Sequence, residues 1–338
     1  QQRAEAREAE FNMPVNMPLT GRPSRQEPEE KTGRASNAYK EDFGAHLRGK
    51  RPVHNVLSEG VQADGGYLVP EEFERQIVTG LDEANVVRSL AKVITTSAER
   101  KIPVAATHSA AQWTAENGAY TESNPTFDQK TIDAYKLTDL VKVSIELLQD
   151  SMFDLESYIA AEFSRAFGIA EEQAFCVGTG TNQPTGIFTA SGGTVGVTAA
   201  ANNAITADEL ISLVYALKSP YRRNAKFLMN DATVSMIRKL KDNNGAYLWQ
   251  PSIREGVPDM LLNTHVYMSN YMPLPEAGRK AILYGDYSYY WVVCRRPFSV
   301  RALHEKFAEY DQIGYLGVEY LDGRLIRRKA VKGILTTA

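Results

Sequence analysis

The residues whose types could support chemistry in this sequence are a glycine-rich stretch, five histidines and two cysteines. Gly178-Thr179-Gly180, with Gly186 shortly after, has the composition of a phosphate-binding loop. A dinucleotide-binding fingerprint needs a strand before its glycines and a helix after them, whereas here a helical pattern comes first. No GxxxxGK[ST] motif occurs in the chain. The stretch therefore indicates the end of a helix followed by a linker.

The titratable residues form no catalytic or metal-binding pattern. The histidines lack HExxH spacing, Cys176 and Cys294 form no CxxC pair, and no GxSxG elbow is present. The acidic pair Glu171-Glu172 is predicted to be solvated charge on the exposed face of a helix. We therefore expect no catalytic residues, no cofactor and no metal, and predict that the protein is not an enzyme.

Basic residues gather at Arg222-Arg223, at Arg295-Arg296 and at Arg327-Arg328-Lys329. Salt bridges with acidic neighbours are the simplest interpretation, and a weak contact with nucleic acid is the alternative. No aromatic platform interleaves these charges as single-strand binders require. The net charge of -3 does not predict a nucleic-acid binder, and no apolar run approaches the roughly 20 residues that span a bilayer.

A long helix over residues 154–177 is the element around which the chain is organised. Its apolar residues recur in steps of three and four, which is typical of an amphipathic helix of about six turns. Asp154 is a suitable N-cap because its carboxylate can accept from the free amides of the first turn. The glycines from Gly178 onward tolerate left-handed backbone angles and end the helix.

A long β-hairpin is predicted before this helix, over residues 98–138. From Tyr135 the apolar residues alternate with polar ones, the period of a half-buried strand. The tip is polar and carries Trp113, Tyr120 and Phe127. Because a two-stranded hairpin is marginal in water by itself, we expect it to rest on a neighbouring subunit.

The first 64 residues are charged and rich in proline, and they cannot bury enough apolar surface to fold alone. Tyr39, Phe43 and Leu47 form one short apolar stripe. The segment is either an unstructured tail or an arm that docks on a surface supplied elsewhere. Order is predicted to begin at GGYLVP, residues 65–70, followed by a helix over 71–84 and a strand over 86–96.

A linker to Asn203 and then an α/β lobe are predicted after the long helix. Thr206 to Glu209 fits a capping box, and Asn230 or Asp231 can cap a second helix. Strands are expected over 226–229, 265–269, 281–284, 289–293, 298–303, 313–319 and 324–331. Helices and strands alternate without strict βαβ repetition, so the predicted fold class is α+β.

In the order of its parts, the chain resembles the major capsid proteins of tailed bacteriophages, which have the Hong Kong 97 type fold. The resemblance spans roughly residues 35–338. The pieces that carry it are GGYLVP at 65–70, GTGTNQPTGI at 178–187, NNGAYLW at 243–249 and GDYSYY at 285–290.

The resemblance implies a domain organisation for the whole chain. The parts are an N-terminal arm (1–64), the start of a peripheral domain (65–97), an extended β-hairpin loop (98–138), the peripheral domain's spine helix and linker (139–204), an axial domain (205–280) and the returning strands of both domains (281–338).

The implied function is that of a structural protein. Copies of the chain would self-assemble into the pentamers and hexamers of an icosahedral head that encloses double-stranded DNA. The runner-up is an encapsulin-like nanocompartment shell, against which the long, precursor-like arm argues. Predicted assembly contacts are Trp113, Tyr120 and Phe127 in the extended loop and Tyr39 and Phe43 in the arm.

Further expectations concern partners and location. The partners would be other copies of the chain, a portal, a maturation protease, decoration proteins and, through weak non-specific contact, the packaged DNA, with no membrane. The protein would reside in the virion after assembly in the host bacterial cytoplasm. The start at Gln1 fits either removal of a scaffolding segment by protease or an artificial boundary.

Two departures from the family pattern stand out. Where relatives often have LLGxPV, this chain has Leu261-Leu262-Asn263, and Asn tolerates left-handed angles better than most residues. Some relatives join subunits by an isopeptide bond, for which Lys101 or Lys130 could supply the amine and Glu319 the buried glutamate. Because no asparagine follows Asn270, we expect no autocatalytic cross-link.

Overall fold

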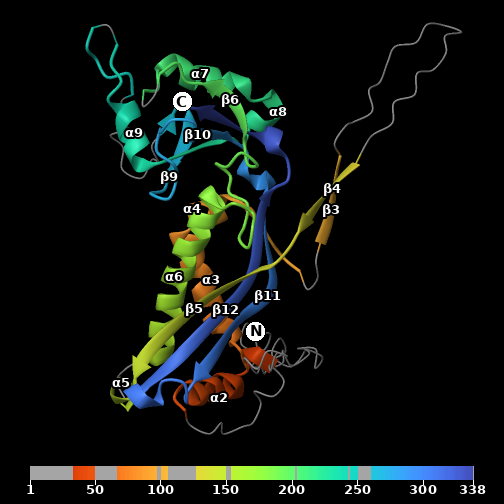
Figure 1. Ribbon diagram of the computed structural model, residues 1–338, viewed down its shortest axis with the longest axis vertical. Helices are drawn as coiled ribbons and strands as arrows, with labels where there is room; N and C mark the ends of the chain where they lie inside the picture. Colours follow the sequence, from red (N-terminus) through yellow and green to blue (C-terminus); the bar gives the residue numbers. More distant parts are fainter. Residues whose placement is uncertain are drawn as a thin grey trace, which may run out of the picture.

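The computed structural model describes residues 33–49, 67–96, 100–105, 127–149, 154–201, 204–242, 244–249 and 260–337. These residues form an elongated lower lobe of long strands and helices, a more compact upper lobe, and a two-stranded hairpin that projects sideways (Figure 1). Helices and sheets are mixed in both lobes, so the predicted α+β class is confirmed.

The lower lobe is built on a five-stranded sheet. Two long antiparallel strands, β11 (Tyr290–Leu303) and β12 (Gln312–Leu325), form its centre, and β5 (Tyr135–Ser144) pairs with the free side of β12. β1 (Tyr67–Leu68) pairs with β11 antiparallel and β2 (Lys92–Thr95) pairs with it in parallel. The predicted strands at 289–293 and 298–303 are thus one strand, interrupted by register shifts near Arg296.

Helices cover one side of this sheet. They are η1 (Gly33–Ala35), α2 (Asn37–Leu47), α3 (Glu71–Ala84), α4 (Val86–Leu90), α5 (Ile145–Gln149) and the spine helix α6 (Leu155–Val177). Asp154 caps α6 as predicted, since its Oδ1 accepts from the Ser157 amide at 3.3 Å. Phe163 and Phe167 of α6 meet Phe298 of β11 in edge-to-face pairs, which join the helix to the sheet.

The upper lobe contains a six-stranded sheet in the order β6 (Thr194–Thr198), β13 (Val331–Leu335), β10 (Lys280–Gly285), β7 (Lys226–Met229), β9 (Thr264–Met268) and β8 (Met260–Leu261). Its helices are α7 (Ala207–Ala216), α8 (Ser219–Arg222) and α9 (Asp231–Arg238). The capping box of Thr206 and Glu209 is present, and Asn230 caps α9. Short 3-10 turns η3 (Tyr287–Tyr289) and η5 (Arg328–Ala330) adjoin its strands β10 and β13, whereas η4 (Ala308–Tyr310) connects β11 and β12 of the lower lobe.

The sideways hairpin consists of β3 (Arg100–Ala105) paired antiparallel with β4 (Phe127–Ile132). These strands fall within the predicted extended loop. Trp113 and Tyr120, predicted near its tip, lie outside the described residues, and Phe127 is the first residue of β4.

Several local predictions were wrong. The expected strand over 86–96 begins as helix α4, because Asn85 accepts from the Arg88 amide and starts a helical turn. The expected linker before Asn203 contains β6, which gains its hydrogen bonds from β13 far along the chain. Gly178 has ordinary backbone angles, whereas Gly180 is left-handed at φ 79°.

The substituted turn at Leu261-Leu262-Asn263 behaves as expected. Asn263 has φ 61° and Leu262 has φ 47°, so both central residues are left-handed between β8 and β9. Asparagine fits this conformation because its short polar side chain tolerates it.

Candidate assembly site

A group of ionisable side chains, three of them buried and one half-buried, lies where α4 and α6 meet strands β11 and β12. We call Arg88, Glu171, Cys294 and Glu319 the buried charge cluster. Arg88 Nη1 donates to both carboxylate oxygens of Glu171, at 3.1 and 3.0 Å, and lies 4.0 Å from Oε1 of Glu319. Cys294 Sγ is 3.9 Å from the same Glu319 oxygen. Four elements distant in sequence are therefore joined at one point.

Helix α4 explains why the cluster forms. Asn85 uses its Oδ1 to cap α4 and its Nδ2 to donate to Glu171 Oε2 at 3.3 Å. Glu172 Oε2 accepts from the Val87 amide at 3.0 Å. The prediction that Glu171-Glu172 is solvated charge was therefore wrong: both residues are buried, because α4 covers the face of α6 that carries them.

In the buried charge cluster, one cation, Arg88, faces two carboxyl groups, those of Glu171 and Glu319. Burial raises the pKa of Glu319 to about 8, the Glu171 carboxylate adds to that rise, and the Arg88 guanidinium opposes it. Burial likewise raises the pKa of Cys294 to about 12. Glu319 therefore holds its proton to a higher pH than a solvated carboxyl group does, while Arg88 is paired with Glu171.

The base of the hairpin is fixed to the same sheet. Asp322 Oδ2 accepts from the Asp133 amide at 3.1 Å, and its Oδ1 accepts from the Gly323 amide at 2.7 Å. Burial raises the pKa of Asp322 to about 6. Ile132, at the end of β4, is buried against Val293 and Ile326. The hairpin thus leaves the sheet from an anchored base.

The loop that follows the spine helix is bound to the sheet by backbone groups. The Gly186 amide donates to Gly178 O at 2.8 Å and the Thr185 amide to Gly323 O at 2.8 Å. Tyr290 Oη donates to Thr185 O at 3.0 Å. Amides that a phosphate loop would point at its ligand are here engaged by carbonyls of the same chain, in keeping with a helix end rather than a phosphate loop.

The described part of the arm packs on its own subunit. Tyr39 and Phe43 of α2 are buried in the lower core, where the Phe43 ring meets Phe73 edge to face at 5.8 Å. Tyr315 Oη donates to Leu47 O at 2.6 Å, which holds the end of α2 against β12. Tyr39 and Phe43 were predicted to contact a neighbour, whereas this structure already covers both side chains within one chain.

The residues considered for a cross-link lie on separate elements. Lys101 and Lys130 are on strands β3 and β4 of the hairpin, and Glu319 is buried in β12, where it belongs to the buried charge cluster. The absence of a cross-link stays a prediction.

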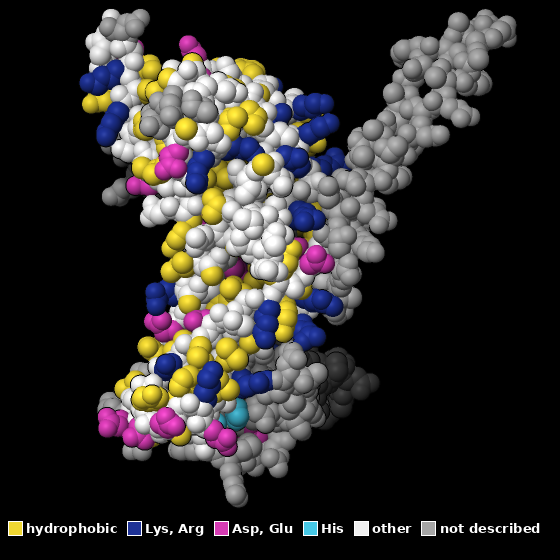
Figure 2. Space-filling model, in the orientation of Figure 1, with side chains coloured by type: hydrophobic (Ala, Val, Ile, Leu, Met, Phe, Trp, Pro, Cys, Tyr) yellow, Lys and Arg dark blue, Asp and Glu magenta, His cyan; other side chains and the backbone are white. Residues whose placement is uncertain are grey.

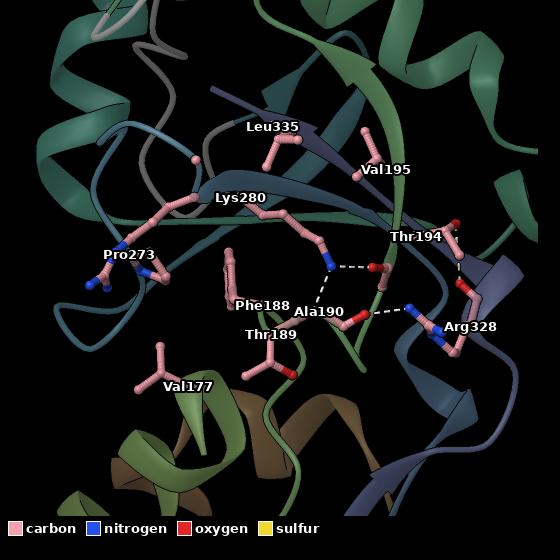
Figure 3. Close-up of a pocket in the computed structure, with 13 residues that line it drawn as sticks. Val177, Phe188, Thr189, Ala190, Thr194, Val195, Pro273, Lys280, Arg328 and Leu335 are labelled. Carbon is pink, nitrogen blue, oxygen red and sulfur yellow. Dashed lines mark hydrogen bonds between the residues drawn. The ribbon is translucent and has the colours of Figure 1, made fainter. Parts of the chain in front are cut away.

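A cavity of about 530 Å³ lies at the junction of the two lobes, between the end of α6 and the upper sheet (Figure 3). Lys280 Nζ donates to Thr189 O at 2.6 Å and to Gly193 O, while Arg328 donates to Gly192 O at 3.0 Å and to Ala190 O. Burial lowers the pKa of Lys280 to about 8, and the Arg328 charge acts in the same direction. Both cations hold the segment that connects the lobes.

The part of the chain that the structure describes contains neither a group of metal ligands nor a membrane-spanning helix. No three His, Cys, Asp or Glu side chains there are grouped so that they could hold a metal ion. None of the described helices is long and apolar enough to cross a membrane.

The chain combines a spine helix, a long central strand pair, a compact second lobe and a hairpin anchored at its base. Together these features define the Hong Kong 97 type capsid fold. The chain belongs to the phage capsid family, whose model matches residues 65–334. No match is found among curated proteins.

Solved capsid structures agree with this assignment. The chain is 30% identical to the capsid of a native GTA particle, with a TM-score of 0.67, over 75% of this chain and 91% of that one. A protein of Microbacterium phage Oxtober96 matches over 75% and 91% of the two chains, with 17% identity and a TM-score of 0.58. A protein of Mycobacterium phage Bobi matches with 19% identity and a TM-score of 0.56, over 75% and 91%.

These matches confirm the predicted function. The chain is a major capsid protein, a structural subunit that self-assembles into an icosahedral head, and its place is in the capsid. The comparisons do not favour the encapsulin-like alternative.

Proposed function

We propose that neighbouring subunits are joined mainly through the hairpin of β3 and β4. The observation that supports this is its geometry: the hairpin is anchored at Asp133 and Ile132 but projects away from both lobes (Figure 1). A two-stranded hairpin gains little stability alone, so a surface of another copy is its natural support. Repeated head-to-tail contacts of this kind close into rings, here pentamers and hexamers.

Trp113, Tyr120 and Phe127 are the proposed contacts of this hairpin. At about 25 cal/mol per Å² of buried apolar area, a large aromatic covered by a neighbour contributes on the order of 2 kcal/mol. Association entropy and polar desolvation reduce that gain. In this proposal Tyr39 and Phe43 stabilise the subunit and position the arm, instead of touching the neighbour.

The two lobes would take up different places in the shell. We assign the lower lobe with the spine helix to the peripheral domain and the upper lobe to the axial domain near each capsomer centre. The head would assemble in the host cytoplasm, enclose double-stranded DNA and work with a portal, a maturation protease and decoration proteins. The role is structural and needs no catalytic residue or cofactor.

Electron microscopy and thermal unfolding of the purified particles test this proposal. We expect Trp113→Ala to lower the melting temperature of the shell while the isolated subunit unfolds as before. Tyr310→Ala is the matched control, because Tyr310 is 71% exposed on η4, away from the hairpin. Equal particle melting in both variants would contradict the proposal.

A denaturing gel tests the proposed absence of a cross-link. Without an isopeptide bond, boiled particles should run as a single monomer band. A ladder of covalent oligomers that disappears in Lys101→Arg or Lys130→Arg would refute the expectation drawn from the missing asparagine.

A further inference from the structure

A second cavity, of about 490 Å³, opens beside α8 in the upper lobe. Its walls carry Arg222, Arg223, Lys226 and His265, which we call the basic cleft, and Asp286 lies among them. Figure 2 shows Lys and Arg side chains gathered at the right-hand edge of the upper lobe, over the place of α8 in Figure 1. The feature stands out in a chain whose net charge is -3.

The charges of the basic cleft are only partly balanced. Arg222 is held in place because its Nε donates to Leu217 O at 2.7 Å and its Nη2 to Tyr215 O at 3.3 Å, and neither contact neutralises it. Asp286 is the acidic residue in the wall, and its Oδ1 is already engaged by the amide and hydroxyl of Ser288, at 3.0 and 2.6 Å. The cleft therefore presents three cationic side chains against one carboxylate.

The cleft also contains an unused polar atom. His265 Nδ1 is buried and makes no hydrogen bond within the described ranges of the chain. Buried polar atoms are usually satisfied, so an atom of this kind in the wall of a cavity indicates a missing hydrogen-bonding partner.

An aromatic pair brings a second basic segment to the rim. The rings of Tyr221 and Tyr289 lie 5.5 Å apart, nearly perpendicular, and the Arg327 guanidinium sits 5.8 Å from the Tyr289 ring centre. Tyr221 is the sequence neighbour of Arg222, and Tyr289 contacts Arg327, so the pair joins two basic segments about a hundred residues apart. The fold thus adds Tyr289 to Tyr221, the aromatic residue that directly precedes Arg222 in the sequence.

We propose that the basic cleft, with Arg327 and the Tyr221–Tyr289 pair at its rim, binds phosphate groups of the nucleic acid backbone. The inference rests on the proposed function, in which the shell encloses double-stranded DNA. Arg and Lys side chains are the usual phosphate ligands, and such contacts carry no sequence information.

A salt titration of DNA binding tests the proposal with the full-length chain. Fluorescence anisotropy of a labelled duplex of about 30 base pairs is followed between about 50 and about 200 mM salt. Arg223→Gln/Lys226→Gln removes two of the three cations that line the cleft. The control, Lys239→Gln/Lys241→Gln, removes two exposed cations near the end of α9, on the opposite side of the same lobe (Figure 1).

We expect the cleft variant to reduce the slope of log K against log salt by about 1.8, from two phosphate contacts at about 0.9 each, equally for unrelated sequences. The control should keep the wild-type slope. Arg223→Lys/Lys226→Arg, which preserves both charges, should restore it if the fold is intact. Identical slopes for the cleft variant and the control would overturn the proposal.

Electron microscopy of the same variants separates the assembly of the shell from the binding of DNA by the basic cleft. A cleft variant that still forms shells but binds DNA more weakly supports the basic cleft as a nucleic-acid site. A cleft variant that binds DNA as the wild type does but forms no shells overturns it, because the cleft would then be a subunit contact. If the wild-type chain forms no shells, the proposed assembly is wrong. The salt dependence of DNA binding would still show whether the basic cleft binds phosphate groups.

Discussion

The two lobes bury their charges in opposite ways. In the lower lobe, Arg88, Glu171, Glu319 and Asp322 are all under 10% exposed and join helices and strands in its interior. In the upper lobe, an apolar cluster fills the space between sheet and helices, and the buried charged residues Lys280 and Asp286 lie in cavity walls. Stability of the lower lobe should therefore depend on charge and pH, whereas that of the upper lobe should depend on packing.

The largest expected effect is that of removing the cation of the buried charge cluster. Arg88→Met leaves Glu171 buried without its partner, which costs about 3–5 kcal/mol. Thermal unfolding should show this loss. Arg165→Met is the control, because Arg165 forms an exposed pair with Glu162 at 2.8 Å, and such pairs contribute about 1 kcal/mol or less. Similar melting temperatures for the two variants would show that the buried charge cluster contributes no more to stability than an exposed ion pair does. The lower lobe would then not differ from the upper lobe in its dependence on buried charge.

The matching change in the upper lobe is Leu213→Ala. Leu213 of α7 is fully buried in the apolar cluster, so truncation leaves a cavity and costs on the order of 3 kcal/mol. The loss should be the same at about pH 5 and about pH 8, since no titrating group is involved. A loss that changes with pH would show that the upper lobe also relies on buried charge.

Glu319→Gln should make the stability of the lower lobe less dependent on pH. The unfolded chain releases the Glu319 proton near the ordinary value of 4.5, whereas the folded chain holds it to about 8. Stability of the wild type should therefore fall as pH rises from about 4.5 to about 8, and glutamine, which mimics the protonated acid, should prevent that fall.

The difference in stability between the two proteins should grow toward the alkaline end of this range. Melting curves across the pH series measure it. Glu305→Gln, at an exposed glutamate, is the control and should follow the wild type. If Glu319→Gln also followed the wild type, the cluster would not govern the pH response of the lower lobe.

The smallest effect concerns a local contact in the upper lobe. Thr206→Ala removes the oxygen that accepts from the Glu209 amide at 3.3 Å, and loss of such a cap costs about 1 kcal/mol. Thr206→Ser should retain the cap and nearly all of the stability. Urea unfolding resolves a difference of this size, and the loss should not vary with pH.

The predictions that succeeded from sequence were those decided by neighbouring residues. Asp154, Thr206 and Asn230 cap their helices because the amides they accept from are within three residues. Glu171-Glu172 was placed wrongly because its burial depends on Asn85 and α4, more than 80 residues earlier. The spacing of apolar and polar residues along a long helix does not show which of its faces a distant segment will cover.

Strand β6 and the basic cleft were missed for the same reason. β6 is rich in Thr, Gly and Val and owes its strand state to pairing with β13. The basic clusters were visible, but the tyrosines that lie between them come from two separate segments. Contacts at the hairpin tip stay predictions, since Trp113 and Tyr120 lie outside the described residues.

The strand order has a consequence for the synthesis of the chain. β12 lies between β11 and β5, and β13 lies between β6 and β10, so each sheet is completed by a strand that comes late in the sequence. Pairings between such distant segments fold slowly and leave strand edges exposed in the meantime. The lower sheet therefore cannot be completed until residue 325 has left the ribosome, nor the upper sheet until residue 335 has, and chaperones should engage the nascent chain until then.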